Sequence, residues 1–285
     1  MTPSIVSLSN VSKRYGDTMA LDQVNLEIQP GRIVGLIGPN GACKTTLLKC
    51  LLGLAPYEGV IQVLGKDPMK QRQEILKEVC FIADTAILPR WIKVHQTLDY
   101  LSGVHPRFNR EKAEAFLKET QIKPNKKVKQ LSKGMITQLH LALVMAIDAS
   151  LLVLDEPTLG LDILYRKKFY TSLLNDYFDR ERTILVTTHQ VEEIEDLISD
   201  LVFIQSGRVV LNQSMERCQA NFVELEVDPG QLDRARALGP ISERSTLGSS
   251  VLLFENIDRS ELIGLGRLRI PRIADLFVAK MQQGV

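Results

Sequence analysis

The chain has 285 residues, of which 45% are hydrophobic and 24% are charged, and its formal net charge is +1. This is globular composition, sufficient for one large core or for a large and a small domain. A charge so close to zero gives no electrostatic reason to expect nucleic acid or an anionic surface as a partner of the chain as a whole.

The sequence predicts neither a leader segment nor a membrane span. Residues 1–4 lack a basic stretch followed by an apolar one, so we expect no signal peptide. The longest apolar region, residues 139–154, contains His140 and Asp148 and leads into two acidic residues, so it is too short and too polar to cross a bilayer. The four cysteines show no metal-binding spacing and are expected to be reduced thiols in the cytoplasm.

The first predicted strands are residues 5–11 and 24–28, where apolar and polar residues alternate. Between them lies Tyr15, in the sequence Lys-Arg-Tyr-Gly. An exposed turn residue is one interpretation of this tyrosine. The other, favoured because of the motif that follows, is a platform on which a purine ring stacks.

The strongest motif follows a buried apolar run, residues 33–37, and precedes leucines at helical spacing. It consists of Gly38, Pro39, Asn40, Gly41, Ala42, Cys43, Lys44, Thr45 and Thr46. Strand, glycine-rich turn and helix are the context of a P-loop, whose backbone N–H groups surround phosphates at a helix N-terminus. Lys44 is then expected to reach the β- and γ-phosphates and the Thr45 hydroxyl to contact Mg²⁺.

Cys43 departs from this motif, because glycine is usual immediately before the lysine. A Cβ here would crowd the phosphates, so we expect weakened nucleotide binding or turnover rather than unfolding. The helix N-terminus and the neighbouring Lys44 both favour a thiolate, which predicts that this cysteine is the most reactive of the four.

The middle of the chain changes character. Residues 59–65 are a predicted strand, residues 74–80 a helix, and residues 79–83 a strand that ends at Asp84. Residues 85–150 suit short amphipathic helices, joined by a basic segment, residues 123–129, which is interpreted as a solvated connection. Ser132 is a predicted N-cap of the helix that runs through Leu139 and Leu143.

Two further apolar strands end in polar residues. Residues 151–154 lead into Asp155 and Glu156, and adjacent carboxylates at the end of a buried strand are costly unless they bind something. Residues 183–188 end at His189 and are followed by a predicted acidic helix, residues 191–198. Residues 201–204 and 208–211 flank Ser-Gly as a hairpin. From residue 220 the pattern changes again, which predicts a small α+β domain, residues 220–285, without a chemical motif.

Taken in order, these motifs resemble the ATP-binding subunits of ABC transporters. The resemblance covers nearly the whole chain: residues 38–46 are similar to Walker A, residues 131–135 to the signature sequence, and residues 151–156 to Walker B. Gly160, Leu161 and Asp162 resemble the D-loop, His189 the switch histidine, and Tyr15 the adenine-stacking aromatic residue. The signature variant and the ending around residues 271–277 look most like the ABC-2-type exporter branch.

The resemblance implies an α/β fold, a P-loop NTPase of ABC type in residues 1–219 with a helical subdomain at about residues 85–150, followed by the small C-terminal domain. It implies ATP and Mg²⁺ as cofactors, with Thr45, Asp155 and the Q-loop residue Asp84 at the metal. It implies that Glu156 polarises the attacking water and that His189 contacts the γ-phosphate. It also implies that Ser132 and Gly134 meet the γ-phosphate of an opposite subunit, and that the D-loop residue Asp162 takes part in nucleotide binding.

The implied partners are an integral-membrane permease and a second ATPase subunit, identical or related, with the chain peripheral on the cytoplasmic face of the cell membrane. Besides Cys43, the departures from the family pattern are Lys133 and Met135 in the signature and Asp84 in place of glutamine or glutamate. A degenerate regulatory subunit or another non-transport ABC module therefore stays open as the alternative. The translation-associated type carries two such domains in one chain, and the repair type needs an inserted coiled coil for which this chain has no room.

Overall fold

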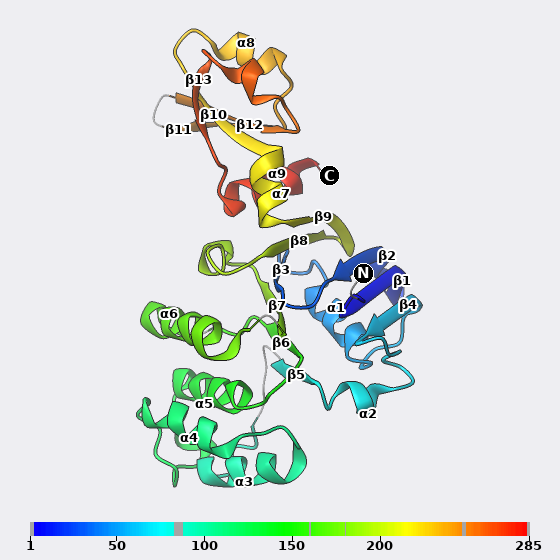
Figure 1. Ribbon diagram of the computed structural model, residues 1–285, viewed down its shortest axis with the longest axis vertical. Coiled ribbons are helices and arrows are strands. Elements are labelled where there is room, and N and C mark those ends of the chain that lie inside the picture. The colour runs from blue at the N-terminus through cyan, green and yellow to red at the C-terminus, as the bar shows by residue number, and fades with distance from the viewer. Residues whose placement is uncertain (1–2, 83–87, 160, 180, 247–248, 284–285) are drawn as a thin grey trace.

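We describe a computed structural model of the chain, covering residues 3–82, 88–159, 161–179, 181–246 and 249–283. The molecule is elongated, with the C-terminal domain at one end of its long axis and helices α3 (Val94–Val104) and α4 (Arg110–Lys118) at the other (Figure 1). Within the described residues, none of the helices combines the length and the apolar content that crossing a bilayer would take.

The centre of the molecule is a six-stranded sheet in the order β5-β6-β7-β3-β8-β9. Its first five strands run parallel and comprise β5 (Val79–Ile82), β6 (Leu151–Asp155), β7 (Thr183–Thr188), β3 (Ile33–Ile37) and β8 (Asp200–Gln205). The hairpin partner β9 (Arg208–Ser214) is antiparallel. Every residue of β3, β6 and β7 is buried, as continuous apolar runs in a parallel sheet require. All of the strands expected in this region are confirmed.

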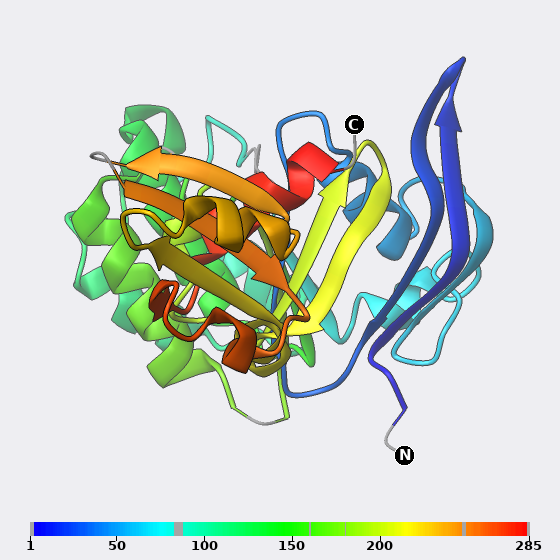
Figure 2. The ribbon, with the colours of Figure 1, turned by 90° about the horizontal axis from the view of Figure 1, so that it is seen from above.

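A second, antiparallel sheet contains β1 (Val6–Tyr15), β2 (Thr18–Ile28) and β4 (Glu58–Val63), in the order β2-β1-β4. Helix α1 (Lys44–Leu51) follows β3, and its buried Leu47 and Leu48 join a core that this sheet and the central sheet share. Helix α2 (Arg72–Ile75) has four residues, fewer than the helix expected over residues 74–80. Figure 2 shows the antiparallel sheet and the helices α3 to α6 on opposite sides of the molecule.

Helices α3 and α4, the 3-10 turn η1 (Val128–Gln130) and α5 (Lys133–Met145) form a helical unit with its own core, which includes Val94, Leu117, Leu139 and Leu143. The predicted helical subdomain is therefore present. Helix α6 (Ile163–Ser172), which continues into the π-helical turn η2 (Leu173–Tyr177), lies beside α5 (Figure 1), and buried residues of both helices share one hydrophobic cluster with the central sheet. After β7, the chain forms only the 3-10 turn η3 (Val191–Glu193), so the acidic helix expected over residues 191–198 was wrong in type and length.

The C-terminal part begins with α7 (Met215–Asn221) and has a four-stranded antiparallel sheet in the order β11-β12-β10-β13. Its remaining elements are β10 (Phe222–Val227), α8 (Leu232–Ala237), β11 (Ser242–Thr246), β12 (Ser249–Glu255), η4 (Arg259–Leu262), β13 (Gly266–Arg269) and α9 (Ile273–Gln283). The α+β character is as expected. The boundary at residue 219 stays a prediction, because Leu253, Ile273 and Leu276 share one hydrophobic cluster with Leu201 and Phe203 of the central sheet.

Candidate nucleotide-binding site

The P-loop lies between β3 and α1, as the motif predicts, and spans Gly38, Pro39, Asn40, Gly41, Ala42 and Cys43 before the helix begins at Lys44. Gly41 and Cys43 both have positive φ, +82° and +69°. A Cβ built on Gly38 would lie 2.5 Å from the backbone oxygen of Ile204, so the sheet accepts only glycine there. The loop is thus fixed by close packing on β8 and by left-handed backbone turns.

Lys44 is buried and its ammonium points back over this loop. Its Nζ donates to the backbone oxygen of Gly38 at 2.7 Å and reaches that of Pro39 at 3.4 Å. The same atom lies 3.7 Å from Glu156 Oε1. A cation held at the loop, beside a carboxylate that follows another strand, is in place to meet an anion that enters between them.

Asp155, the last residue of β6, is only 1% exposed and accepts two hydroxyl hydrogen bonds. Thr45 Oγ1 donates to its Oδ2 at 2.8 Å and Thr187 Oγ1 donates to its Oδ1 at 2.6 Å. A carboxylate and a hydroxyl on adjacent elements are hard oxygen donors, which fits Mg²⁺ because this ion takes one or two carboxylates and completes its shell with water and phosphate oxygens. Thr46, next in α1, is half-buried.

Glu156 lies between Lys44 and His189. Its φ is +49°, and its backbone N–H donates to both Thr187 O at 3.2 Å and Thr187 Oγ1 at 3.1 Å. Its Oε2 is 2.9 Å from His189 Nδ1. The sharp backbone turn after β6 directs this side chain toward the P-loop instead of continuing along the strand, and such strain is typical of residues held in place for a function. The structure therefore brings together Lys44, Thr45, Asp155, Glu156 and His189.

The Cys43 thiol is half-buried and lies within 3.4 Å of the Gly41 backbone oxygen, which it reaches as a weak donor. Burial raises the pKa of Cys43, so the expectation of an activated thiolate was wrong. The Lys44 ammonium points to the loop carbonyls and Glu156, which is why it does not stabilise the thiolate. Burial also raises the pKa values of Cys50 and Cys218 to about 11 and that of Cys80 to about 12. Cys43 is the least buried of the four cysteines.

Tyr15 ends β1 at the tip of the hairpin, where it pairs with Thr18, and is 48% exposed. Lys13 Nζ lies 4.7 Å from its ring centroid, a cation–π contact. The ring is accessible for stacking, and its role toward a base stays a prediction. Asp84 lies outside the described residues, as does Gly160 of the D-loop.

The signature residues form a separate surface at the start of α5. Ser132 is its N-cap, as predicted, and accepts a hydrogen bond from Met135 N at 3.2 Å. Asp162 caps α6 by accepting from Leu164 N and Tyr165 N, both at 3.1 Å. Ser132, Gly134 and Asp162 line one shallow cavity together with Gln138 and Tyr165. Within the described part of the chain, no hydrogen bond or ion pair joins Ser132, Gly134 or Asp162 to Lys44 or Glu156, which is the arrangement expected if they serve another subunit.

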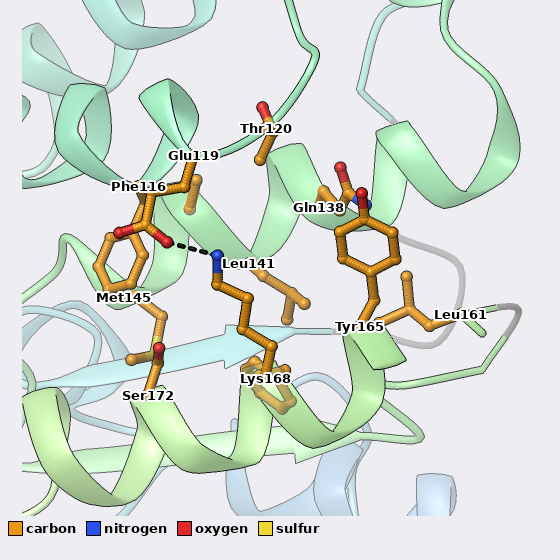
Figure 3. A pocket seen from close by; sticks show the side chains of 12 residues that line it. Phe116, Glu119, Thr120, Gln138, Leu141, Met145, Leu161, Tyr165, Lys168 and Ser172 are labelled. Carbon is orange, nitrogen blue, oxygen red and sulfur yellow. Dashed lines mark ion pairs between the residues drawn. The ribbon is translucent and has the colours of Figure 1, made fainter. Parts of the chain in front are cut away.

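A neighbouring apolar pocket lies between α4, α5 and α6 and shares Gln138, Leu161 and Tyr165 with that cavity (Figure 3). Figure 3 shows Lys168 of α6 pointing across it to Glu119, and their charged atoms are 2.5 Å apart. The side chains that line this pocket and the Lys168–Glu119 ion pair connect the helical unit to α6, the helix that follows Leu161 and Asp162.

Sequence reasoning missed two groups that support the site. The Thr187 hydroxyl donates to the carboxylate of Asp155, at the end of β6, and accepts from the backbone N–H of Glu156, which follows β6. Arg166 of α6 is ion-paired to Glu193 and donates to Leu161 O at 2.7 Å and to Gln190 Oε1 at 2.6 Å, while Thr158 Oγ1 donates to Glu193 Oε2 at 2.8 Å. This network links the chain after Glu156 to the chain after His189. Its only sequence signal is a set of polar residues shortly after each motif.

Comparisons with known proteins agree with this geometry. A family model described as ABC transporter matches residues 21–159. A Nod factor export ATP-binding protein I from Sinorhizobium fredii is 32% identical, with 96% of this chain and 84% of that protein covered. One from Burkholderia pseudomallei is 33% identical over 92% of this chain and 89% of its own length. The daunorubicin resistance ATP-binding protein DrrA3 of Streptomyces coeruleorubidus is 30% identical, with 85% and 80% covered.

Solved structures show the same fold. The ATP-binding subunit of an ABC transporter superimposes with a TM-score of 0.69 at 22% identity, covering 76% of this chain and 92% of that one. A bacterial Atm1-family ABC exporter with ATP bound gives 0.66 at 20% identity, covering 77% and 40%. From its motifs, its fold and these relatives, the chain belongs to the ABC transporter family as an ATP-binding subunit, most similar to those of the ABC-2-type exporters.

Proposed function

We propose that this chain binds Mg-ATP and hydrolyses it, and that hydrolysis in a dimer of two such subunits powers export through an integral-membrane permease. The relatives named for Nod factor export and daunorubicin resistance support an exporter role. The chain would then act at the cytoplasmic face of the membrane, held there by the permease.

The observation that carries this proposal is the placement of Glu156. Its carboxylate lies between the Lys44 ammonium, 3.7 Å away, and the His189 ring, 2.9 Å away, and its neighbour Asp155 is bonded to Thr45. Phosphoryl transfer to water needs phosphates held by positive charge, a metal ion and an acceptor that orients the water. In this proposal the P-loop and Lys44 hold the phosphates, Thr45 and Asp155 hold Mg²⁺, Glu156 orients the water and His189 contacts the γ-phosphate.

Mg²⁺ would supply charge neutralisation at the β- and γ-phosphates when it is bound. The chain's own residues do the rest. Thr187 keeps Asp155 and the Glu156 backbone in register, and the Arg166–Glu193 pair fixes the segments that follow Glu156 and His189. Tyr15 would stack on the adenine, and Ser132, Gly134 and Asp162 would contact the nucleotide held by the opposite subunit.

The test replaces Glu156 with glutamine, which keeps the size of the side chain and removes its charge. We expect Glu156→Gln to bind ATP, to lose at least about a hundredfold in turnover, as removal of one general base or stabilising group typically does, and to accumulate as a dimer with Mg-ATP. Turnover by phosphate release and mass by light scattering are the measurements, with Glu192→Gln, an exposed neighbour of the same charge, as the control.

Turnover near that of the parent in Glu156→Gln would remove Glu156 from this role. A parent chain that binds ATP and hydrolyses none, alone or with its permease, would support the degenerate regulatory alternative.

A further inference from the structure

Two paired segments of the helical unit carry positive charge and no acidic residue of their own. We call their outer side the basic face; its residues are Arg90, Lys93, Lys123, Lys126, Lys127 and Lys129. These six and Lys133 at the start of α5 lie in residues 88–98 and 120–147, which contain none of the chain's 34 aspartates and glutamates. The rest of the chain therefore has an acidic excess, although the total charge is +1. Among the described residues, no ion pair involves any of the seven, whereas Arg110–Glu114 and Lys168–Glu119 pair nearby on α4 and α6.

The fold places the two segments side by side. Val94 N donates to Lys126 O at 3.0 Å, Val128 N donates to Ile92 O at 2.9 Å, and Lys129 N donates to Arg90 O at 2.9 Å. In this antiparallel pairing Lys93 lies directly opposite Lys127. The adjacent Val94 and Val128 are buried in the core of the helical unit, so the two lysines point to its outer side.

Like charges directly opposite each other on paired strands destabilise the pairing. The paired segments contain no acidic side chain that offsets this cost. Glu114 of α4 lines a cavity with Lys123 and Lys126, but its ion pair is with Arg110, at 2.8 Å. An anionic partner on the outer side would turn the same arrangement from unfavourable to favourable.

An exposed tryptophan lies within the basic face. Trp91, between Arg90 and Ile92, is 70% exposed, and Tyr100 and Val104 of the adjoining α3 are exposed as well. Tryptophan combines a large apolar ring with one N–H donor, which favours the boundary between lipid headgroups and acyl chains. Cations together with exposed aromatic rings are the features that bind a protein to the surface of an anionic membrane.

We propose that the basic face binds anionic lipid headgroups directly, with its lysines and Arg90 at the phosphates and the Trp91 ring among the headgroups. The proposed function serves here only as the reason why a membrane is at hand. Nucleic acid fits less well, because a single exposed tryptophan makes no row of stacking platforms and the acidic excess elsewhere repels a long polyanion.

The chain provides its own probe, because Trp91 is its only tryptophan. Vesicles of phosphatidylcholine with about one third phosphatidylglycerol, where each basic residue near the surface strengthens binding about fivefold, should sediment the nucleotide-free chain at low salt and shift the Trp91 emission to shorter wavelength. Pure phosphatidylcholine vesicles should do neither. Raising the salt should release the chain, because the Debye length falls to about 3 Å at 1 M.

Matched variants locate the contact. The triple variant Lys123→Gln, Lys127→Gln, Lys129→Gln removes three exposed charges of the basic face and leaves the signature residue Lys133 in place. We expect it to lose about a hundredfold in affinity for the anionic vesicles, from three charges at about fivefold each. Arg217→Gln, Arg267→Gln, Arg272→Gln removes three exposed charges from the C-terminal part and should bind within about threefold of the parent.

Several results would overturn the proposal: equal binding to neutral and anionic vesicles, equal losses in the two triple variants, or a sedimented chain whose Trp91 emission is unshifted. Displacement by duplex DNA at equal phosphate concentration would mark a general polyanion surface and overturn the lipid assignment. Binding to neutral vesicles only when they contain the permease would assign the face to a protein instead. None of these readouts depends on ATP, so their failure leaves the proposed ATPase role to its own test.

Discussion

Cys43 adopts φ = +69° immediately before the P-loop lysine, a backbone conformation that costs a residue with a Cβ about 1 kcal/mol relative to glycine. We expect Cys43→Gly to relieve this strain and to bind ATP more tightly, whereas Cys43→Ala, which keeps the Cβ, should stay close to the parent. Nucleotide affinity by titration calorimetry compares the three proteins. Equal affinity in all of them would show that the cysteine is harmless to the phosphate site.

Thr187 contacts Asp155 and Glu156 at once, and it is fully buried. Thr187→Val keeps its shape but leaves Asp155 Oδ1 without its hydroxyl donor, which should cost about 1–3 kcal/mol of unfolding free energy and raise the Mg²⁺ concentration needed for half-maximal activity. Thr187→Ser keeps the hydroxyl and should restore the Mg²⁺ dependence. Denaturant unfolding and Mg²⁺ titration of ATPase activity are the measurements. An unchanged Mg²⁺ dependence in Thr187→Val would reduce this residue to a packing role.

These two residues show what sequence can foresee at a site. The P-loop and the carboxylates at the end of β6 are local patterns. That they lie close together follows from the rule that parallel strands present their carboxyl ends at one edge of the sheet. Thr187 acts through its register with Asp155 on the neighbouring strand, which depends on strand order and has no local signal. The positive φ of Cys43 explains why glycine is usual at this position. The direction of the Lys44 ammonium, toward the loop carbonyls and away from the Cys43 thiol, could be seen only in the structure.

Among the elements, the strands could be predicted better than the short helices. Buried apolar runs such as β3 and β6 have one stable environment, the middle of a parallel sheet. Residues 191–198 have apolar side chains at helical spacing, and Val191, Ile194 and Ile198 are indeed buried. Ile194 and Ile198 pack against Gly35, 3.0 and 3.2 Å from where a Cβ on that glycine would lie. Glu193 is bound by Arg166 and Thr158, so tertiary contacts override the helical preference.

Helix α5 contains a half-buried histidine, His140, which makes the stability of the chain sensitive to acid. Burial lowers the pKa of His140 to about 4 from an ordinary value of 6.5. Between these values the unfolded chain binds the proton and the folded chain does not, so stability falls as the pH drops from 6.5 toward 4. We expect a lower melting temperature at pH 5 than at pH 7, and a smaller difference in His140→Gln.

The control for this prediction is the change in melting temperature with pH above pH 7, where the histidine is mostly neutral in both the folded and the unfolded chain. There the parent and His140→Gln should respond to pH alike. If the parent and His140→Gln show the same slope of melting temperature against pH between 7 and 5, other groups carry the acid sensitivity.

At the scale of the whole molecule, sequence predicted a C-terminal domain appended to the ATPase, and the structure ties its last helix into the central core. Ile273, Leu276 and Ala279 of α9 are buried in one cluster with Leu201 and Phe203 of β8. The rings of Phe277 and Phe203 meet edge to face with centroids 5.2 Å apart. The sequence pattern predicts the character of each segment by itself. It does not predict how α9 docks, because this docking depends on contacts between segments far apart in the chain.

Helix α9 also contacts the chain that follows His189, because Ile273 N donates to Glu195 Oε1 at 2.9 Å. The C-terminal domain is therefore joined mechanically to the segment beside the proposed γ-phosphate contact. If this joint makes the two parts one cooperative unit, Leu276→Ala should destabilise the whole chain by about 2–5 kcal/mol, the usual cost of emptying a buried leucine site. Val278→Ala, on the exposed side of the same helix, should change stability by less than about 0.5 kcal/mol.

Calorimetry distinguishes this cooperative unit from an appended domain. We expect one unfolding transition, which Leu276→Ala shifts to lower temperature and ATP shifts to higher temperature. A ligand that binds only the folded state raises the transition temperature of every part that unfolds together with its site. Two transitions, with the one that responds to ATP unaffected by Leu276→Ala, would mean that the C-terminal domain folds independently and that the boundary at residue 219 divides the chain as the sequence first predicted.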